Sequence, residues 1–151
     1  MKLAEGLILR ADYQKRIEQL KKRLFNCAKV QEGEEPAEDP QVLLKEIDDI
    51  MKELTVLIKR INKTNCSVQF DETRSLADAL VEREQIWDKR LILSTLSDNA
   101  AIKQDRFSRS EVKFISTIDI SDTQKQIDKL SKEFRELDTK IQGMNWTTDL
   151  I

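Results

Sequence analysis

The sequence contains no histidine among its 151 residues. Histidine is the usual general base of enzymes, the usual partner of a catalytic nucleophile and the commonest metal ligand. Its absence argues against a hydrolase and against a zinc enzyme. The sequence also lacks a glycine-rich phosphate loop, a CxxC pair and a nucleophile elbow. We therefore expect a protein that is not an enzyme and that has no catalytic residues, no metal and no cofactor.

Glycine and proline are scarce, with three and two residues, and aromatic residues make up 5% of the chain. Charged residues, in contrast, make up 36%. Few helix breakers together with many Leu, Ile, Lys, Glu and Arg residues are typical of long helices with solvated outer faces. The length allows one domain with a modest core. We expect a mainly all-α protein in which residues 1–151 form a single domain.

Neither sign of charge dominates, because the net charge is only −2. Nucleic-acid-binding domains usually carry a strong positive excess, so we expect no nucleic-acid partner. The uncharged runs are far shorter than the ~20 apolar residues of a membrane-spanning helix, and no secretory signal follows Met1. We expect a cytoplasmic protein without a membrane partner, in which Cys27 and Cys66 are reduced thiols.

Four stretches of the sequence show apolar residues at spacings of three and four, which is the pattern of an amphipathic helix. They predict helices over about 2–30, 40–64, 75–104 and 121–144. The first seam consists of Tyr13, Ile17, Leu20, Leu24 and Cys27, the second of Leu43, Ile47, Ile50, Leu54, Leu57 and Ile61, and the fourth of Ile127, Leu130, Phe134, Leu137, Ile141 and Met144. Long helices of this kind are expected to form an antiparallel bundle.

Local signals mark the connections between these helices. An acidic linker over 32–39 leads to Asp39, a good N-cap, and Pro40 suits the first helical position. From 105 to 120 the helical period fails. The run EVKFISTI within this segment alternates and is β-branched, so it predicts a short strand or hairpin.

The third predicted helix has two arginines, Arg83 and Arg90, in the middle of its apolar stripe. A buried guanidinium must be paired, and Glu5, Glu18 and Glu46, of the same or a second subunit, are candidate partners. We expect a polar layer that fixes the register or the oligomeric state. The alternatives are an anion site between helices, and a rotated helix whose arginines reach water.

Two further features are candidate contact sites. The stretch RFSRSE places Arg106, Arg109 and Ser110 in a loop that either contacts an anion or a partner or forms a polar turn. The last residues carry Trp146 and two terminal apolar side chains, and we expect this tail to dock on another part of the protein.

The predicted helices are long for a chain of this size, so the bundle should be thin and its apolar arcs wider than one neighbour covers. Self-association into a homo-oligomer is the simplest way to cover them. We expect a cytoplasmic protein with a structural or protein-interaction role. An anion or small-ligand binder that uses the arginines between its helices is an alternative.

Several stretches together resemble one protein family: MKLAEGLILRADYQKRIEQLKKRL, AKVQEGEEPAEDP, INKTN, RFSRSE and NWTTDL. They resemble the septicolysin-like family of small bacterial helical proteins, over essentially the whole chain. The resemblance implies a bundle of long helices that forms homo-oligomers, and the family name implies a membrane-active cytolysin. The residues themselves favour the structural role, because the apolar faces have only the width expected of a water-soluble bundle.

Overall fold

The structure is a computed structural model and describes residues 1–101 and 112–151. Its helices are α1 (Leu3–Asn26), α2 (Pro40–Ser67), α3 (Leu76–Ala100) and α4 (Ile120–Thr147). The described residues form no strand, only two isolated β-bridges. The prediction of an all-α protein built from four long helices is confirmed.

Each helix starts within one residue of its predicted start, because local signals near the first turn set the position. Before α2, the Asp39 carboxylate accepts a hydrogen bond from the Gln41 amide at 2.9 Å. Before α4, the Asp119 carboxylate accepts one from the Asp122 amide at 3.0 Å. Each of these caps satisfies a backbone N–H that has no partner inside its helix.

The helix ends agree less well with the predictions. α1 ends at Asn26 rather than near residue 30, whereas α2 and α4 each continue three residues beyond their predicted ends. In α2 the Thr64 hydroxyl donates to the Arg60 carbonyl at 2.9 Å, a bond that threonine makes inside a helix without ending it. α3 ends at Ala100, and residues 102–104 of its predicted range lie outside the described residues.

The linker between α1 and α2 turns at Gly33, whose φ of 86° lies in the left-handed region that glycine adopts without a steric penalty. Beyond this turn Glu38 accepts two hydrogen bonds from the Arg23 guanidinium of α1, one of them from Nε at 2.9 Å. These bonds raise the pKa of Arg23 and lower the pKa of Glu38. The acidic linker is thus tied back to the basic first helix.

The connection between α2 and α3 is a tight turn around Asp71. Its carboxylate accepts hydrogen bonds from the Thr73 and Arg74 amides, both at 3.0 Å, and from Arg74 Nε at 2.8 Å. These donors, with the Arg74 side chain first, hold the pKa of Asp71 far below its ordinary value. The Arg74 guanidinium also lies 5.1 Å above the ring of Phe70, which is buried.

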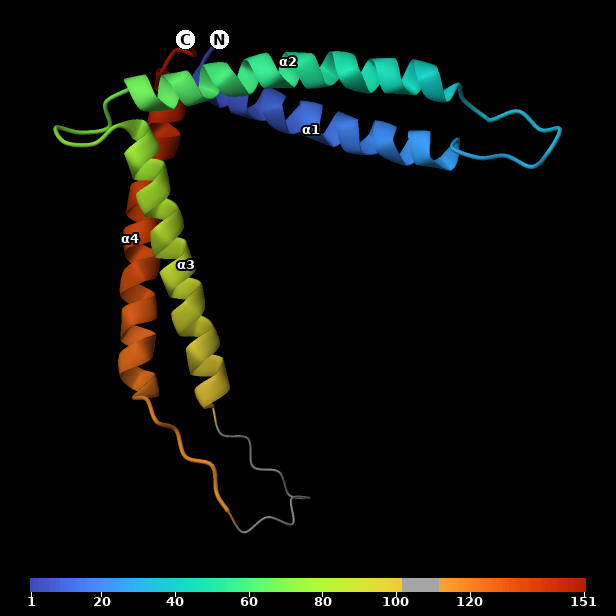
Figure 1. The fold of residues 1–151 in the computed structure, drawn as a ribbon. Coiled ribbons are helices and arrows are strands. Elements are labelled where there is room, and N and C mark those ends of the chain that lie inside the picture. The colour runs from blue at the N-terminus through green and yellow to red at the C-terminus, as the bar shows by residue number, and fades with distance from the viewer. Residues whose placement is uncertain (102–111) are drawn as a thin grey trace. The chain divides into compact units, whose positions relative to one another are not determined.

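Contacts divide the chain into two compact units, Met1–Leu76 with Gln142–Ile151, and Ala77–Ile141. In the first unit α1 and α2 lie side by side and antiparallel (Figure 1). The core between them consists of Leu20, Leu43, Ile47 and Ile50, with Tyr13, Ile17 and Leu24 packed against it. All seven belong to the predicted apolar seams, so the seams of these two helices are confirmed as core.

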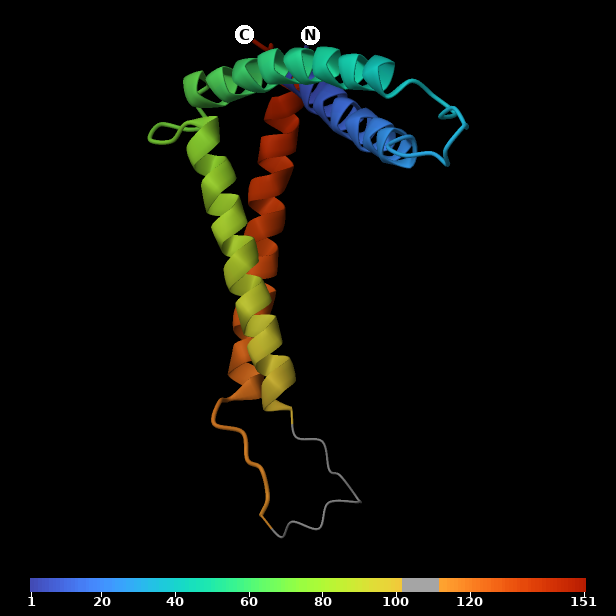
Figure 2. The same ribbon diagram turned by 45° about the vertical axis from the view of Figure 1, so that its right-hand side comes forward.

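In the second unit α3 and α4 form an antiparallel pair (Figure 2). Few of its described residues are buried, and they are Ala79, Thr123, Ile127 and Ile141. Two helices have only one contact line between them, so most apolar side chains on the pair stay partly exposed.

The predicted strand or hairpin over 105–120 is not formed in the part that the structure describes. Residues 112–119 contain no strand, and 105–111 lie outside the described residues. Val112, Phe114 and Ile115 are each at least 80% exposed, because no neighbouring strand offers them a ladder. That 1–151 form a single domain stays a prediction.

Candidate functional site

The contact between α3 and α4 has a polar centre. Arg83 Nη1 donates to Asp138 Oδ1 at 2.6 Å, and the two side chains are 22% and 32% exposed. Arg90 Nε donates to the Ser131 hydroxyl at 2.7 Å. Both arginines of the predicted stripe therefore face α4. We call these two pairs the polar layer.

An aromatic contact lies between the two pairs of the polar layer. The ring centroids of Trp87 and Phe134 are 5.1 Å apart and their planes are inclined by 50°. The Arg90 guanidinium lies 5.0 Å from the centroid of the same Trp87 ring. Trp87 thus contacts both the Phe134 ring and the Arg90 guanidinium.

The three contacts follow a single antiparallel register. From Arg83 to Trp87 to Arg90 the residue number rises by four and then three, and from Asp138 to Phe134 to Ser131 it falls by the same steps. A shift of one turn would place each guanidinium opposite an apolar side chain. A part-buried charge left unpaired in this way costs about 1–3 kcal/mol or more. The polar layer therefore selects one register.

The carboxylates that we expected to pair with these arginines bind other groups, all within the first unit. Glu5 accepts from the Lys2 amide at 2.6 Å, Glu18 pairs with Lys21 at 2.8 Å, and Glu46 pairs with Arg16 at 2.6 Å. The observed partners, Asp138 and Ser131, were not among the predicted ones. The signal that would have found them is spacing, because Ser131 and Asp138 are seven residues apart, as are the two arginines.

The other predicted contact residues have different outcomes. Arg106, Arg109 and Ser110 lie outside the described residues. Trp146 is described, and its side chain is 57% exposed rather than docked. The tail docks instead through Leu150, which is 7% exposed.

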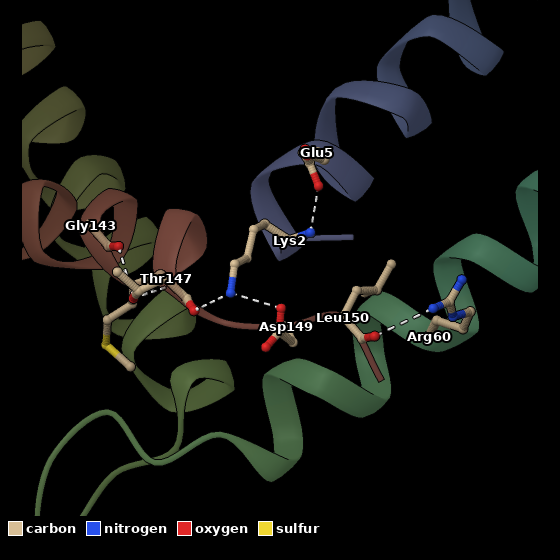
Figure 3. Close-up of polar contacts among 8 residues, drawn as sticks. Lys2, Glu5, Arg60, Gly143, Thr147, Asp149 and Leu150 are labelled. Atoms are coloured by element: carbon tan, nitrogen blue, oxygen red, sulfur yellow. Dashed lines mark hydrogen bonds and ion pairs between the residues drawn. The ribbon is translucent and has the colours of Figure 1, made fainter.

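Docking of the tail joins the two ends of the chain through a set of contacts that we call the terminal clamp, drawn in Figure 3. The Lys2 ammonium donates to Asp149 Oδ1 at 2.8 Å and to the Thr147 carbonyl at 3.0 Å. These contacts with Lys2 lower the pKa of Asp149. The Leu3 amide donates to the Thr148 carbonyl at 2.9 Å, which adds a backbone bond between the ends.

α2 holds the last two residues of the clamp. Arg60 Nε donates to the Ile151 carbonyl at 2.9 Å, and the Ile151 amide donates to the buried Thr64 hydroxyl at 3.0 Å. Leu150 lies against Gly6 of α1, where an added Cβ would be 3.0 Å from Leu150 Cδ2. The sequence indicated an apolar tail, but nothing local in it identified Lys2, Arg60 and Thr64 as its anchors.

Several large apolar side chains of α3 are exposed in the second unit. The helix carries Val81, Leu91, Ile92 and Leu96, which are 59%, 53%, 67% and 42% exposed. Trp87, although it contacts Phe134, is still 45% exposed. A cluster of this kind on one helix is typical of a surface that contacts another molecule.

The described part of the chain contains no candidate metal site and no candidate membrane span. Over residues 1–101 and 112–151, no cluster of three or more His, Cys, Asp or Glu residues is arranged to hold a metal ion. No helix within these ranges is long and apolar enough to cross a membrane. The two cysteines are not joined, and Cys27 is buried whereas Cys66 is exposed.

Comparison with known proteins corrects one expectation. No curated protein matches the chain. Its fold and sequence are similar to those of a functionally unknown conserved protein from Corynebacterium diphtheriae, known from a crystal structure. The two are 42% identical with a TM-score of 0.92, over 100% of this chain and 99% of that chain. The family model that matches residues 10–150 is that of a family of unknown function, so the resemblance to the septicolysin-like family was wrong. The chain belongs to the DUF6847 family.

Proposed function

We propose that the protein is a cytoplasmic homo-oligomer with a structural or protein-interaction role and without catalytic activity. The observation that carries this proposal is the exposed apolar surface of α3, which includes Val81, Leu91 and Ile92. Covering these side chains would release free energy in proportion to the apolar area that is removed from water.

The thin architecture of the second unit supports the same proposal. Its two helices bury few residues between them, and a polar layer takes up the centre of their contact. A helix pair of this kind gains most of its stability when further helices cover its apolar faces, as in a four-helix bundle. A second copy of the chain supplies such helices without any other partner.

The polar layer favours a structural role over a ligand site. Arg83 is bonded to Asp138, and Arg90 is bonded to Ser131 and stacked on Trp87. Groups already engaged in this way specify how helices pair, which is the best-attested role of polar residues inside helical seams. Two free thiols are consistent with the cytoplasm, where cysteines are kept reduced.

The experiment that tests the proposal is thermal unfolding at chain concentrations from about 1 to 100 µM. When association stabilises the folded state, mass action makes the unfolding midpoint rise with concentration. We expect such a rise in a single cooperative transition. A midpoint that is independent of concentration over this range would contradict the proposal.

A further inference from the structure

Val81 and Ile92 lie on the side of α3 that is turned away from α4, whereas Leu91 lies about a quarter turn to one side of it. Val81 precedes Arg83 by two residues and Ile92 follows Arg90 by two, and two residues correspond to a rotation of about 200° around a helix. Since both arginines contact α4, Val81 and Ile92 point nearly the opposite way. They are 59% and 67% exposed. We call Val81, Ile92 and Leu96, with Leu91 at the edge, the outer face of α3. On the same side of the helix, Glu84, Gln85 and Asp88 lie between Val81 and Ile92.

The apolar surface continues beyond the end of the helix. Leu96 and Ala100 line a cleft of about 340 Å³ together with Phe114, Ile115 and Ile118 of the following segment. Phe114 and Ile115 are 87% and 80% exposed. The outer face therefore runs along α3 and onto residues 114–118.

The size of this surface fits a helical dimer. α3 has 25 residues, which corresponds to a helix about 37 Å long and ~10 Å wide, so one of its faces covers roughly 400 Å². A stable interface buries about 800 Å² on each partner. This side of α3 supplies about half of that area, and residues 114–118 lie next to Leu96 at its end to supply more.

The order of charges along the helix indicates how two copies meet. Glu84 and Asp88 lie in the first half of α3, and Lys89 follows at the middle. In a parallel pair, Glu84 and Asp88 of one chain would lie beside the same acidic residues of the other chain. An antiparallel pair with a two-fold axis between residues 88 and 89 brings Asp88 of one copy opposite Lys89 of the other. Within the described part of the chain, no ion pair uses Asp88 or Lys89.

We infer that the outer face of α3 binds the same face of a second copy of this chain, antiparallel about a two-fold axis between Asp88 and Lys89. This inference rests on the proposed self-association and specifies where it occurs. In this arrangement Leu96 of one copy packs near Val81 of the other, and the ion pair forms twice because the interface is symmetric. Each copy keeps its own polar layer on the opposite side of α3.

The first test uses two valines with the same exposure. Val81 on α3 and Val56 on α2 are both 59% exposed, so Val81→Glu and Val56→Glu make the same chemical change on different surfaces. Each variant and the unaltered chain are examined by sedimentation velocity, with circular dichroism as the check on helix content. We expect Val81→Glu to weaken association by at least about 100-fold, because each copy would then bury a carboxylate in an apolar interface. Val56→Glu should leave association unchanged.

The second test examines the orientation with substitutions that keep the apolar residues. Asp88→Lys places two lysines opposite each other and should weaken the dimer about 3–10-fold, as expected for two exposed pairs. Adding Lys89→Asp to the same chain exchanges the two charges and should restore the original affinity. The charge exchange remains a valid test of the interface even if Val81→Glu loses helix content.

The outcomes separate the inference from the function on which it rests. An unaltered chain that is monomeric would overturn both. An oligomer that survives Val81→Glu, or that Val56→Glu dissociates, would overturn only the inference and place the interface elsewhere. A double charge variant that remains as weak as Asp88→Lys would overturn the antiparallel geometry. Sedimentation of a monomeric chain with phosphatidylcholine vesicles, lost in Val81→Glu, would assign the outer face to lipid and also overturn the inference.

Discussion

Arg83 of α3 and Asp138 of α4 form a 2.6 Å ion pair across the contact between the two helices. Seven residues further along α3, Arg90 bonds to Ser131 of α4 and forms the second pair of the polar layer. These bonds replace apolar packing at the place where it would be densest. The helices therefore gain a defined register, while several apolar side chains of α3 stay exposed.

The Arg83–Asp138 pair should matter more when it is broken than when it is replaced. We expect Asp138→Leu to lower the free energy of unfolding by about 1–3 kcal/mol, because it leaves a guanidinium without its carboxylate at a part-buried position. The double variant Arg83→Leu/Asp138→Leu should recover most of that loss. Urea unfolding of the single and double variants measures the coupling. If the loss of stability in the double variant equals the sum of the losses in the single variants, Arg83 and Asp138 do not stabilise the protein as a pair.

A control for this cycle is the surface pair of Lys129 and Glu133 on α4, whose charged atoms are 4.0 Å apart. The side chains are 77% and 45% exposed. Replacing both with Ala should change the free energy of unfolding by no more than about 0.5 kcal/mol. A larger change would show that charge removal on α4 acts without regard to position.

Two helical glycines should respond differently to the same substitution. Gly143→Ala adds a methyl group where no atom lies within 4 Å, so it should stabilise the protein by about 0.5–1 kcal/mol through helix propensity. Gly6→Ala should gain less or lose stability, because the new Cβ would be 3.0 Å from Leu150 Cδ2 in the terminal clamp. Equal gains in thermal unfolding would mean that Leu150 does not press against α1.

The terminal clamp should depend on Leu150 rather than on the last residue. Leu150→Ala removes a side chain that is 7% exposed and should cost about 2–3 kcal/mol. Ile151→Ala removes one that is 48% exposed and should cost less than about 0.5 kcal/mol. Chemical unfolding gives both values, and carboxypeptidase digestion gives a second measure, since a detached tail is cut faster. Similar values for the two variants would contradict the docking of Leu150.

The turn around Asp71 predicts how stability depends on pH. The pKa of this carboxyl is held below its ordinary value by the Arg74 side chain and by backbone amides. The folded state therefore binds a proton here less readily than the unfolded state, whose carboxyl titrates near pH 3.9. The stabilisation is fully present above that pH and is lost as the pH falls below it.

Asp71→Asn tests this dependence. The variant should be less stable than the unaltered chain at pH 7, because the amide cannot keep the charged contact with Arg74. Below about pH 4 its stability should fall less steeply than that of the unaltered chain. Unfolding curves between pH 2.5 and 7 measure both slopes. If the free energy of unfolding falls equally steeply in both proteins, another carboxyl causes the loss of stability at low pH.

The apolar periodicity and the N-cap residues predicted the helices and their starts. The seams of Leu20, Ile47 and Ile50 became core, and Asp39 with Pro40 began α2 as expected, because these features depend on residues close together in the sequence. Helix ends were placed less well, since no single residue stops a helix that tertiary contacts continue to support. The alternating run at 112–118 formed no strand, because pairing needs a second segment that alternation alone does not supply.

The candidate site was only half predictable. The position of Arg83 in the apolar stripe indicated a polar contact, but the choice of Asp138 over Glu5, Glu18 or Glu46 depends on which helices pair and in which register. The anchors of the tail, Lys2 and Thr64, are separated from it by most of the chain or by two helices. Short stretches of sequence likewise led to the wrong family, which the match over residues 10–150 corrects.

The central claim is that the chain covers the outer face of α3 with a second copy of itself. The most direct measurement is native mass by light scattering during gel filtration, over a range of concentrations and salt. We predict a closed oligomer of at least two 17.6 kDa chains whose mass is retained as salt increases, because apolar burial dominates the interface. A mass of one chain at every concentration would contradict the account.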